Sequence, residues 1–259
     1  MNWVDICVAN ARLWRRVQAD DTPLRYWVIG SVIPLIFRST VYVLIGRMLS
    51  GGAGMAWTFT GIIFLALTGQ TISSVSDIPI YDVWFHAYPS VSRASTPVLV
   101  QYLARATILI GRALAEAVIT CLAVGFATNN SALILPLLQR GWILLPAVLS
   151  CTAFGLAIIA PAIGNRSQDL IHNTAGALLV LTSGALLMPG RAPWLHAVGS
   201  VLPLQHAIDA MRSSLSGHDP WPSVRAELLV LCGWLAVAAA AYHLVDRRTR
   251  ATGRGAMQG

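Results

Sequence analysis

Residues 202–212 read Leu-Pro-Leu-Gln-His-Ala-Ile-Asp-Ala-Met-Arg, and this amphipathic run decides how the end of the chain folds. Pro203 suits the first turn of a helix, where its missing N–H leaves no hydrogen bond unmade. Ser216 and Gly217 close the run, and another apolar stretch follows. Because non-spanning backbone is tolerated in a bilayer where it is buried in protein, we expect a short re-entrant helix before the last span. Its helical period would give an apolar side of Leu204, Ala207, Ile208 and Met211 and a polar side of Gln205, Asp209 and Arg212.

The composition around this run is that of a membrane protein. Hydrophobic residues make up 56% of the 259 residues and charged residues 11%, whereas soluble domains have roughly 45–50% and about 25%. A helix needs about 20 apolar residues to cross the hydrocarbon core. We therefore predict an all-α polytopic protein, with residues 1–22 preceding a transmembrane domain of residues 23–259. Six spans are expected, at about 26–46, 55–75, 106–126, 141–163, 171–189 and 226–245.

The arginines predict the orientation, because basic residues near span ends are retained in the cytoplasm. With the N-terminus inside, 11 of the 18 arginines fall on the cytoplasmic side and 5 on the other, while Arg38 and Arg112 lie within spans. Both termini are therefore expected in the cytoplasm, the C-terminal tail being residues 246–259. The lysine-free, alanine-rich composition is typical of a high-GC bacterium and favours a bacterial plasma membrane.

The net charge of +7 is spread over short loops and tails. A nucleic-acid partner would need this charge gathered on one folded face, so none is expected. Positive charge on the cytoplasmic side is instead a topology signal and an attraction to anionic membrane lipid.

All 18 basic residues are arginine, which excludes several kinds of site. A phosphate-binding loop of the G-x-x-x-x-G-K-[ST] type requires a lysine, as does a Schiff-base enzyme. If ATP drives this protein, another polypeptide must hydrolyse it. The four cysteines are widely separated and the histidines lack zinc-site spacing, so neither a disulfide framework nor a metal site is indicated.

Residues 1–22 are predicted to form an amphipathic helix on the cytoplasmic membrane surface. Apolar side chains, including Trp14, recur at steps of three and four residues, and most charged ones lie elsewhere on the helix. This helix could be a plain membrane anchor or could contact a partner protein.

The longest cytoplasmic loop is expected at residues 76–105. It combines the aromatic residues Trp84, Phe85 and Tyr88 with the acid Asp82, a mixture that suits a short helix docking into a groove on another protein. The alternative is an aromatic belt at the membrane interface.

Charged and small residues inside spans are further candidates. Arg112 and Glu116 are four residues apart on one helical face, so we predict a structural ion pair between them. Arg38 has no evident local partner and is a candidate for facing substrate. Gly176 and Gly184 would let another helix approach closely, either within the chain or in a dimer.

Three segments carry a family resemblance. Residues 82–93, with Tyr88-Pro89 and Val91-Ser92-Arg93, resemble the cytoplasmic loop of type-2 ABC exporter permeases (ABC-2). Residues 111–116 resemble the start of that family's third span, and residues 192–212 resemble its extracellular re-entrant element. In order and spacing the similarity covers nearly the whole chain.

The resemblance implies half of an ATP-driven exporter. Two permease chains, either two copies or a copy and a paralogue, would each dock to a cytoplasmic ABC ATPase, which would bind ATP and magnesium. This chain would then hold no cofactor, metal or catalytic residue. We assign contact with the ATPase to Trp14, Asp82, Trp84, Phe85 and Tyr88; the substrate path to Arg38, Gly176 and Gly184; and an extracellular gate, within residues 190–225, to Pro203, His206, Asp209 and Arg212.

The few charges within spans predict an amphiphilic cargo such as a lipophilic antibiotic, a lipid or a lipid-linked glycan. Antibiotic and drug exporters are the nearest resemblance, and polysaccharide or teichoic-acid exporters are the alternative. A proton-coupled carrier would need acids at the midplane, and Glu116 is the only acid well inside a predicted span. An intramembrane enzyme would need a catalytic constellation, which the sequence does not show.

Overall fold

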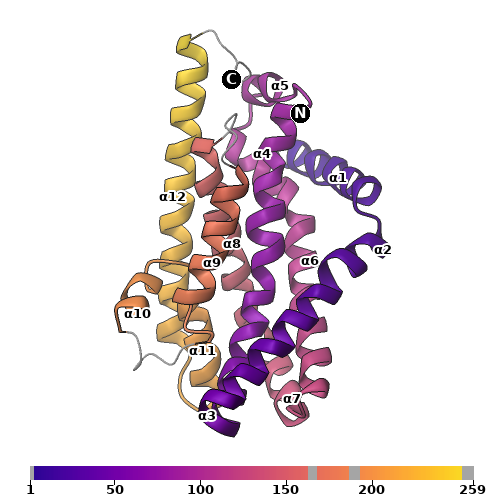
Figure 1. Cartoon of the computed structure of the whole chain (residues 1–259). Helices are drawn as coiled ribbons and strands as arrows, with labels where there is room; N and C mark the ends of the chain where they lie inside the picture. The colour runs from indigo at the N-terminus through magenta and orange to yellow at the C-terminus, as the bar shows by residue number, and fades with distance from the viewer. Residues whose placement is uncertain (1–2, 163–167, 187–192, 253–259) are drawn as a thin grey trace.

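The computed structural model describes residues 3–162, 168–186 and 193–252, and these ranges are helical with no strand. The predicted all-α class is confirmed. Figure 1 shows the arrangement of the helices as an elongated bundle. In order, the elements are α1 (Trp3–Asp21), α2 (Leu24–Trp27), the π-helix η1 (Val28–Val32), α3 (Ile33–Thr68), the π-helix η2 (Gly69–Ser74), α4 (Val75–Trp84), α5 (Tyr88–Arg93), α6 (Val98–Ala127), α7 (Ser131–Gln139), the 3₁₀ turn η3 (Gly141–Ile143), α8 (Leu144–Ile159), the 3₁₀ turn η4 (Ala160–Ala162), α9 (Gln168–Thr182), α10 (Pro193–Gly199), α11 (Gln205–Leu215) and α12 (Trp221–Thr252).

Within the described ranges, four helical segments are long and apolar enough to cross a membrane. They are Leu24–Trp84, Val98–Ala127, Gly141–Ala162 and Trp221–Arg247, and the apolar part of α9, Leu170–Thr182, is shorter. The predicted spans fall on these segments with two exceptions. The fifth is predicted to reach residue 189, but its helix ends at Thr182 and residues 183–186 form a turn. Residue 163 of the fourth and residues 187–189 of the fifth lie outside the described residues. The count of six spans stays a prediction.

The longest of these segments reverses direction in its middle. Ser50 (φ −146°) and Gly51 (φ 64°) leave the helical conformation, and glycine adopts a positive φ without steric cost. Gly46 and Gly54 pack across the turn, where a side chain on either would collide with the other's backbone. In Figure 1 a first leg, residues 24–50, descends to the turn, and a second leg, residues 51–84, rises to α4.

The interior of the bundle is built around α8. In the span Gly141–Ala162, which contains α8, 83% of the most apolar stretch is buried, whereas in Trp221–Arg247 of α12 the share is 11%. The helix α8 therefore lies inside the bundle and α12 at its edge. Gly155 of α8 contacts the second leg closely, because a Cβ there would come within 2.5 Å of the Thr71 carbonyl oxygen. Small residues of this kind allow membrane helices to pack tightly.

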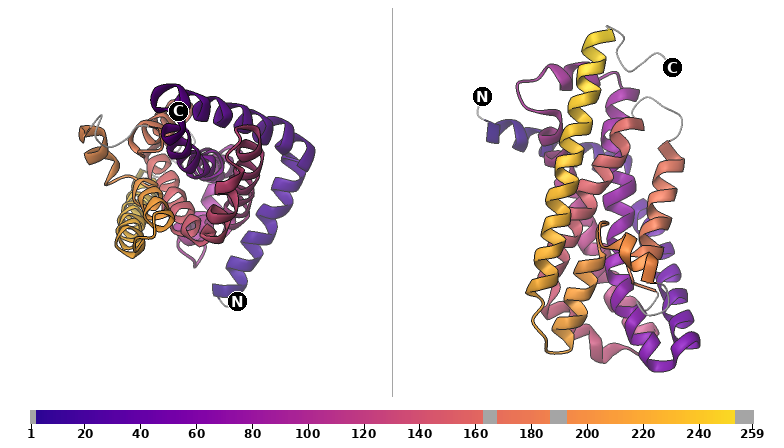
Figure 2. Two further views of the ribbon diagram at one scale, coloured as in Figure 1. Left: turned by 90° about the horizontal axis from the view of Figure 1, so that it is seen from below. Right: turned by 90° about the vertical axis from the view of Figure 1, so that its left-hand side faces the viewer.

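The helix α1 crosses one end of the bundle, as the two views in Figure 2 show. Trp14 is buried there in a cluster with Val75 and Ile78 of α4, Tyr102 of α6 and Tyr242 of α12. The predicted helix at residues 1–22 is therefore present over Trp3–Asp21. Trp14 and Val17 of its apolar side pack on protein, whereas Leu13 is 55% exposed.

Two predicted boundaries differ from the structure. The helix α12 continues to Thr252, so the first part of the expected tail, residues 246–252, extends the last helix, and residues 253–259 lie outside the described residues. The expected loop at residues 76–105 is largely helical, since it holds the end of α4, all of α5 and the start of α6.

Candidate functional site

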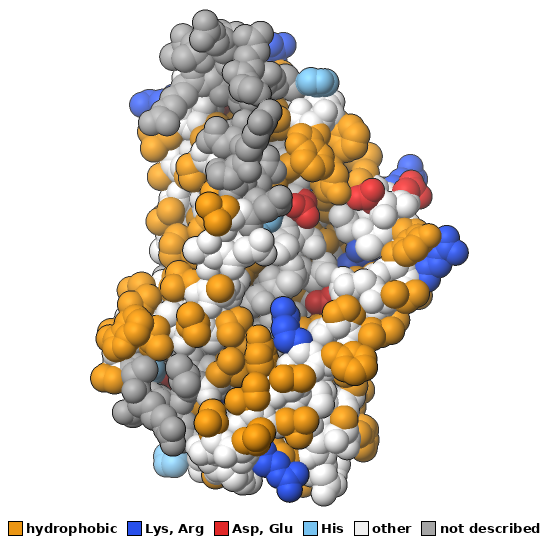
Figure 3. Space-filling model, in the orientation of Figure 1, with side chains coloured by type: hydrophobic (Ala, Val, Ile, Leu, Met, Phe, Trp, Pro, Cys, Tyr) orange, Lys and Arg blue, Asp and Glu red, His pale blue; other side chains and the backbone are white. Residues whose placement is uncertain are grey.

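A cavity of about 440 Å³ lies between the first leg, the second leg with its π-helix η2, and α9. Figure 3 shows this face of the molecule, which is hollowed between the first leg and α9. Arg38 and Gly176, two of the three residues predicted for the substrate path, both line this cavity, whereas Gly184 is not among its lining residues. Its polar lining consists of Arg38, Ser39, Tyr42, Thr68, Ser73, His172 and Asn173.

Arg38 also lines a second cavity of about 510 Å³, which lies between η1, η2 and α6. Glu116 of α6 faces this space. Among the described residues, Arg38 forms no hydrogen bond and no ion pair within 4 Å. The two π-helical segments that border the second cavity are of a rare kind that is frequent at functional sites.

Glu116 holds the two π-helical regions together. Its Oε1 accepts hydrogen bonds from Trp27 Nε1 at 2.8 Å and from Gln70 Nε2 at 2.9 Å. Arg112, one turn away on the same helix, instead donates to Gln18 Oε1 at 2.8 Å and to the Thr22 carbonyl oxygen at 3.2 Å. Arg112 and Glu116 still act on each other electrostatically, but they do not form the predicted direct ion pair within 4 Å, because acceptors at the end of α1 lie within reach of the guanidinium.

At the other end of the bundle, a buried carboxylate holds the start of α11. Glu227 of α12 accepts the backbone N–H of Leu204 at 3.1 Å and that of Ala207 at 3.2 Å. It also accepts a hydrogen bond from Ser150 Oγ of α8. The first N–H groups of a helix have no partner within it, and a negative charge there is favourable. Glu227 therefore joins α8, α11 and α12.

Pro203 is buried directly before this helix. It was predicted to start the helix, but α11 begins at Gln205, after Leu204 with φ 85°. The carboxylate of Glu227 accounts for this later start, since it bonds the backbone N–H of Leu204 itself.

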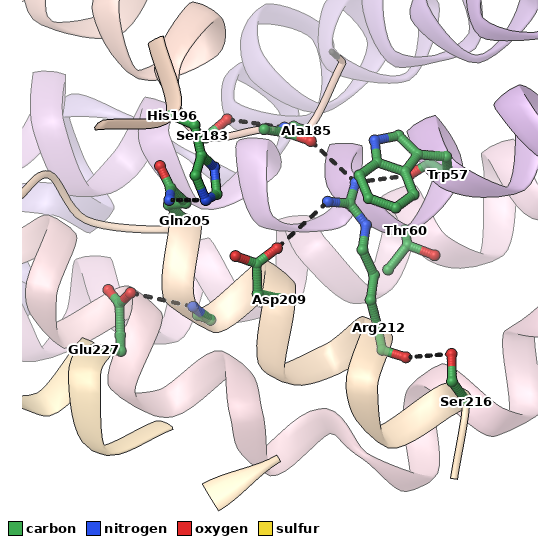
Figure 4. Close-up of polar contacts among 12 residues, drawn as sticks. Trp57, Thr60, Ser183, Ala185, His196, Gln205, Asp209, Arg212, Ser216 and Glu227 are labelled. Atoms are coloured by element: carbon green, nitrogen blue, oxygen red, sulfur yellow. Dashed lines mark hydrogen bonds and ion pairs between the residues drawn. The ribbon is translucent and has the colours of Figure 1, made fainter. Parts of the chain in front are cut away.

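Arg212 joins the far end of α11 to two other elements (Figure 4). Its Nη2 donates to the carbonyl oxygens of Trp57 and Gly184 at 3.1 Å each, and its Cζ lies 3.4 Å from the centre of the Trp57 ring. Its Nη1 is 3.9 Å from Asp209 Oδ1. Burial lowers the pKa of Arg212, and Asp209 acts in the opposite direction. Gly184, predicted for the substrate path, thus lies at a turn with φ 69° that Arg212 holds.

The other predicted gate residue, His206, contacts α10. Its Nε2 lies 2.9 Å from the Ser200 carbonyl oxygen, and Gln205 Nε2 lies 3.2 Å from His196 Nε2. Both contacts fix α10 against α11. The four predicted gate residues therefore lie together, in a segment bonded to α3, to the turn after α9, to α10 and to α12.

The five residues predicted to contact a partner separate into two groups. Trp14, Asp82 and Tyr88 are buried within the chain, whereas Trp84 and Phe85 are 64% and 73% exposed. The exposed rings pack on Tyr81, with ring centres 5.8 and 5.9 Å away.

Asp82 belongs to a buried ion pair. Both of its oxygens lie 2.8 Å from Arg105 Nη1, and Arg105 Nε donates to Asn10 Oδ1 of α1 at 3.0 Å. The pair therefore ties α1, α4 and α6 together beneath the exposed rings.

Sequence reasoning missed Glu227, Ser150 and Trp57. A signal existed for Glu227, because an acid at the edge of an apolar stretch needs a partner. Ser150 and Trp57 gave none, since serine and tryptophan are ordinary residues of membrane helices.

The sequence profile described as ABC-2 type transporter matches residues 11–216. No curated protein and no solved structure matches the chain. The matched range contains both legs of α3, the two cavities and all of α11. Since it covers well over half of the sequence, the chain belongs to the ABC-2 type transporter family, as a multi-pass membrane permease component.

Proposed function

We propose that this chain is the permease subunit of an ATP-driven exporter that moves amphiphilic molecules out of a bacterial cell. The observation that carries the proposal is the cavity of about 440 Å³, which opens among apolar helices in a member of this family. Its mixed lining suits a molecule with a polar end and an apolar body. Antibiotics, lipids and lipid-linked glycans have this character.

The proposal includes six membrane crossings with both termini in the cytoplasm. The crossings would be the two legs of α3 together with α6, α8, α9 and α12. The arrangement in Figure 1 fits this layout, because α1, α4, α5 and the end of α12 lie at one end of the bundle and α7 and α11 lie toward the other. The α11 segment would then form the extracellular gate.

A separate ABC ATPase would dock at the end that holds α4 and α5. Trp84 and Phe85 would make the contact, since both are exposed and supported by Tyr81. Trp14, Asp82 and Tyr88 would hold this segment against α1 and α6 and so transmit its movement to the bundle.

A second permease chain would face the first leg. This leg exposes large apolar side chains, including Phe37 and Met48 at 71% and 86%. Phe37→Cys in a cysteine-free background tests this arrangement in membranes. A cross-linked dimer supports it, and a chain that stays monomeric under oxidation contradicts it.

Reconstitution tests the function as a whole. The chain and the ATPase encoded beside it would be placed in liposomes with a fluorescent phospholipid as the transported probe. We expect ATP-dependent movement only when both proteins are present, and none with an ATPase that binds but cannot hydrolyse ATP. Movement driven by a proton gradient through this chain alone would instead identify a secondary carrier.

A further inference from the structure

We propose that Arg38 makes the cavity beside α9 a binding site for the anionic group of an amphiphile. This inference rests on the proposed function and adds the charge class of the transported molecule, which neither the family nor the apolar spans specify. A carboxylate or phosphate would bind the guanidinium, and the attached hydrocarbon would lie along the apolar part of the lining.

The position of Arg38 is the first argument. It lies midway along the first leg, where its neighbours Phe37 and Val41 are 71% and 50% exposed on the apolar surface. A cation at such a depth is costly unless water or a counter-charge accompanies it. In the described part of the chain, Arg38 has no hydrogen-bond partner and no ion pair within 4 Å, and Glu116 acts on its charge only through the second cavity, without a direct contact. The guanidinium is therefore available to a ligand.

The chemistry of the cavity is the second argument. Among the described side chains that line it, Arg38 is the one arginine and none is an aspartate or glutamate. Ser39, Tyr42 and Ser73 add hydroxyl groups that can donate to the same anion. Leu65 and Val180 supply apolar surface. A cationic ligand would be repelled by Arg38, and the described lining side chains offer it no acid.

The second cavity explains on which side the anion would lie. Glu116 faces that cavity, which Arg38 also lines, and its Oε1 is occupied by Trp27 and Gln70. A ligand carboxylate would be repelled by Glu116 and would bind on the other side of Arg38, toward α9. Binding near α9 would place the ligand against Gly176, where no atom lies within 4 Å of the position that a Cβ would take.

Binding to the purified full-length chain in phosphatidylcholine nanodiscs tests the inference without the ATPase. A fluorescent dansyl fatty acid serves as the probe, with dodecanoate, its methyl ester and dodecyltrimethylammonium as competitors. We expect dodecanoate to displace the probe, and the ester and the cation to be at least about tenfold weaker, because only the acid forms charge-assisted hydrogen bonds with arginine.

Variants assign the binding to Arg38. Arg38→Gln should weaken binding of the probe about tenfold or more, while Arg38→Lys should keep part of the affinity. Arg47→Gln is the matched control, because Arg47 is an exposed arginine nine residues further along the same leg. Glu116→Gln should strengthen binding, since it removes a like charge and keeps an oxygen for Trp27 and Gln70.

Equal displacement by the acid and the ester, or unchanged binding by Arg38→Gln, would overturn the inference. Such a result would leave ATP-dependent transport of a neutral amphiphile, and hence the proposed function, intact. Adding phosphatidylglycerol to the nanodiscs separates two sources of the anion. Competition by this lipid identifies a membrane lipid as the occupant, and the absence of competition identifies a transported acid.

Discussion

Glu227 accepts the backbone N–H of Leu204 at 3.1 Å, and the same carboxylate binds the N–H of Ala207. This contact fixes the start of α11 to α12 at a point where Leu204 has φ 85° and is fully buried. A non-glycine residue with such a backbone conformation persists only where its surroundings hold it. The Glu227 carboxylate is the group that holds it.

Glu227→Ala should therefore lower the free energy of unfolding by roughly 2–4 kcal/mol, because two buried N–H groups lose their acceptor. Thermal unfolding of the purified chain in detergent measures the change. Glu227→Gln keeps one acceptor oxygen and should cost less. Asp219→Ala is the control, since this exposed acid accepts one hydrogen bond among the described residues, from the Trp221 N–H at the start of α12. A midpoint shift equal to that of Glu227→Ala would contradict our account.

Replacing Gly184 or Gly176 by alanine should change the free energy of unfolding in opposite directions. Neither has an atom within 4 Å of the position of an added Cβ, so only the backbone distinguishes them. Gly184 has φ 69°, and alanine there should cost about 1–2 kcal/mol. Gly176 lies within α9, where alanine should be neutral or stabilise the protein by up to about 1 kcal/mol.

Unfolding midpoints of the two variants in the same detergent give the comparison. Equal midpoints would show that the turn at Gly184 is not maintained in solution. A loss confined to Gly184→Ala would support the positive φ of this turn, in which the Gly184 carbonyl oxygen accepts a hydrogen bond from Arg212.

The sequence predicted the grouping of Arg38 and Gly176 because membrane helices tolerate few charges and glycines mark close approach. It failed for Arg112 and Glu116, where spacing along one helix suggested a pair. The actual partners, Gln18 and Gln70, come from helices distant in the sequence. Side-chain pairing inside a bundle depends on which helices become neighbours, and the local period does not contain that information.

The same limit explains the partner-contact residues. Aromatic composition predicted residues 82–88 as a docking segment, and this stays a prediction. The exposure of each ring depends on the neighbouring helices, since Tyr88 lies near Tyr102 of α6 and Tyr242 of α12. Tyr88 is 1% exposed while Phe85 is 73% exposed, although they lie only three residues apart. The turn at His86, with φ 55°, separates them.

Trp84→Ala with Phe85→Ala should weaken binding of the ATPase by about tenfold or more, as expected for exposed aromatic anchors at an interface. The unfolding midpoint should stay close to that of the wild type, because both rings are largely exposed. Titration of the ATPase against the permease in nanodiscs measures the affinity. Trp194→Ala is the matched control, since Trp194 is 68% exposed in α10, and an equal loss there would contradict the assignment.

Removing one member of the buried pair Asp82–Arg105 should strongly destabilise the protein. Replacing both members by apolar residues should be nearly neutral. Removing one partner leaves a charge in a site where both side chains are 8% exposed, so Asp82→Leu or Arg105→Met should cost about 3–5 kcal/mol. The double variant Asp82→Leu with Arg105→Met should recover most of that loss, because no buried charge remains. Unfolding free energies of the two single variants and the double variant form a cycle that isolates the coupling. If the double variant were as unstable as the sum of the single ones, the hydrogen bond of Arg105 to Asn10 would outweigh the ion pair in fixing α1 to the bundle.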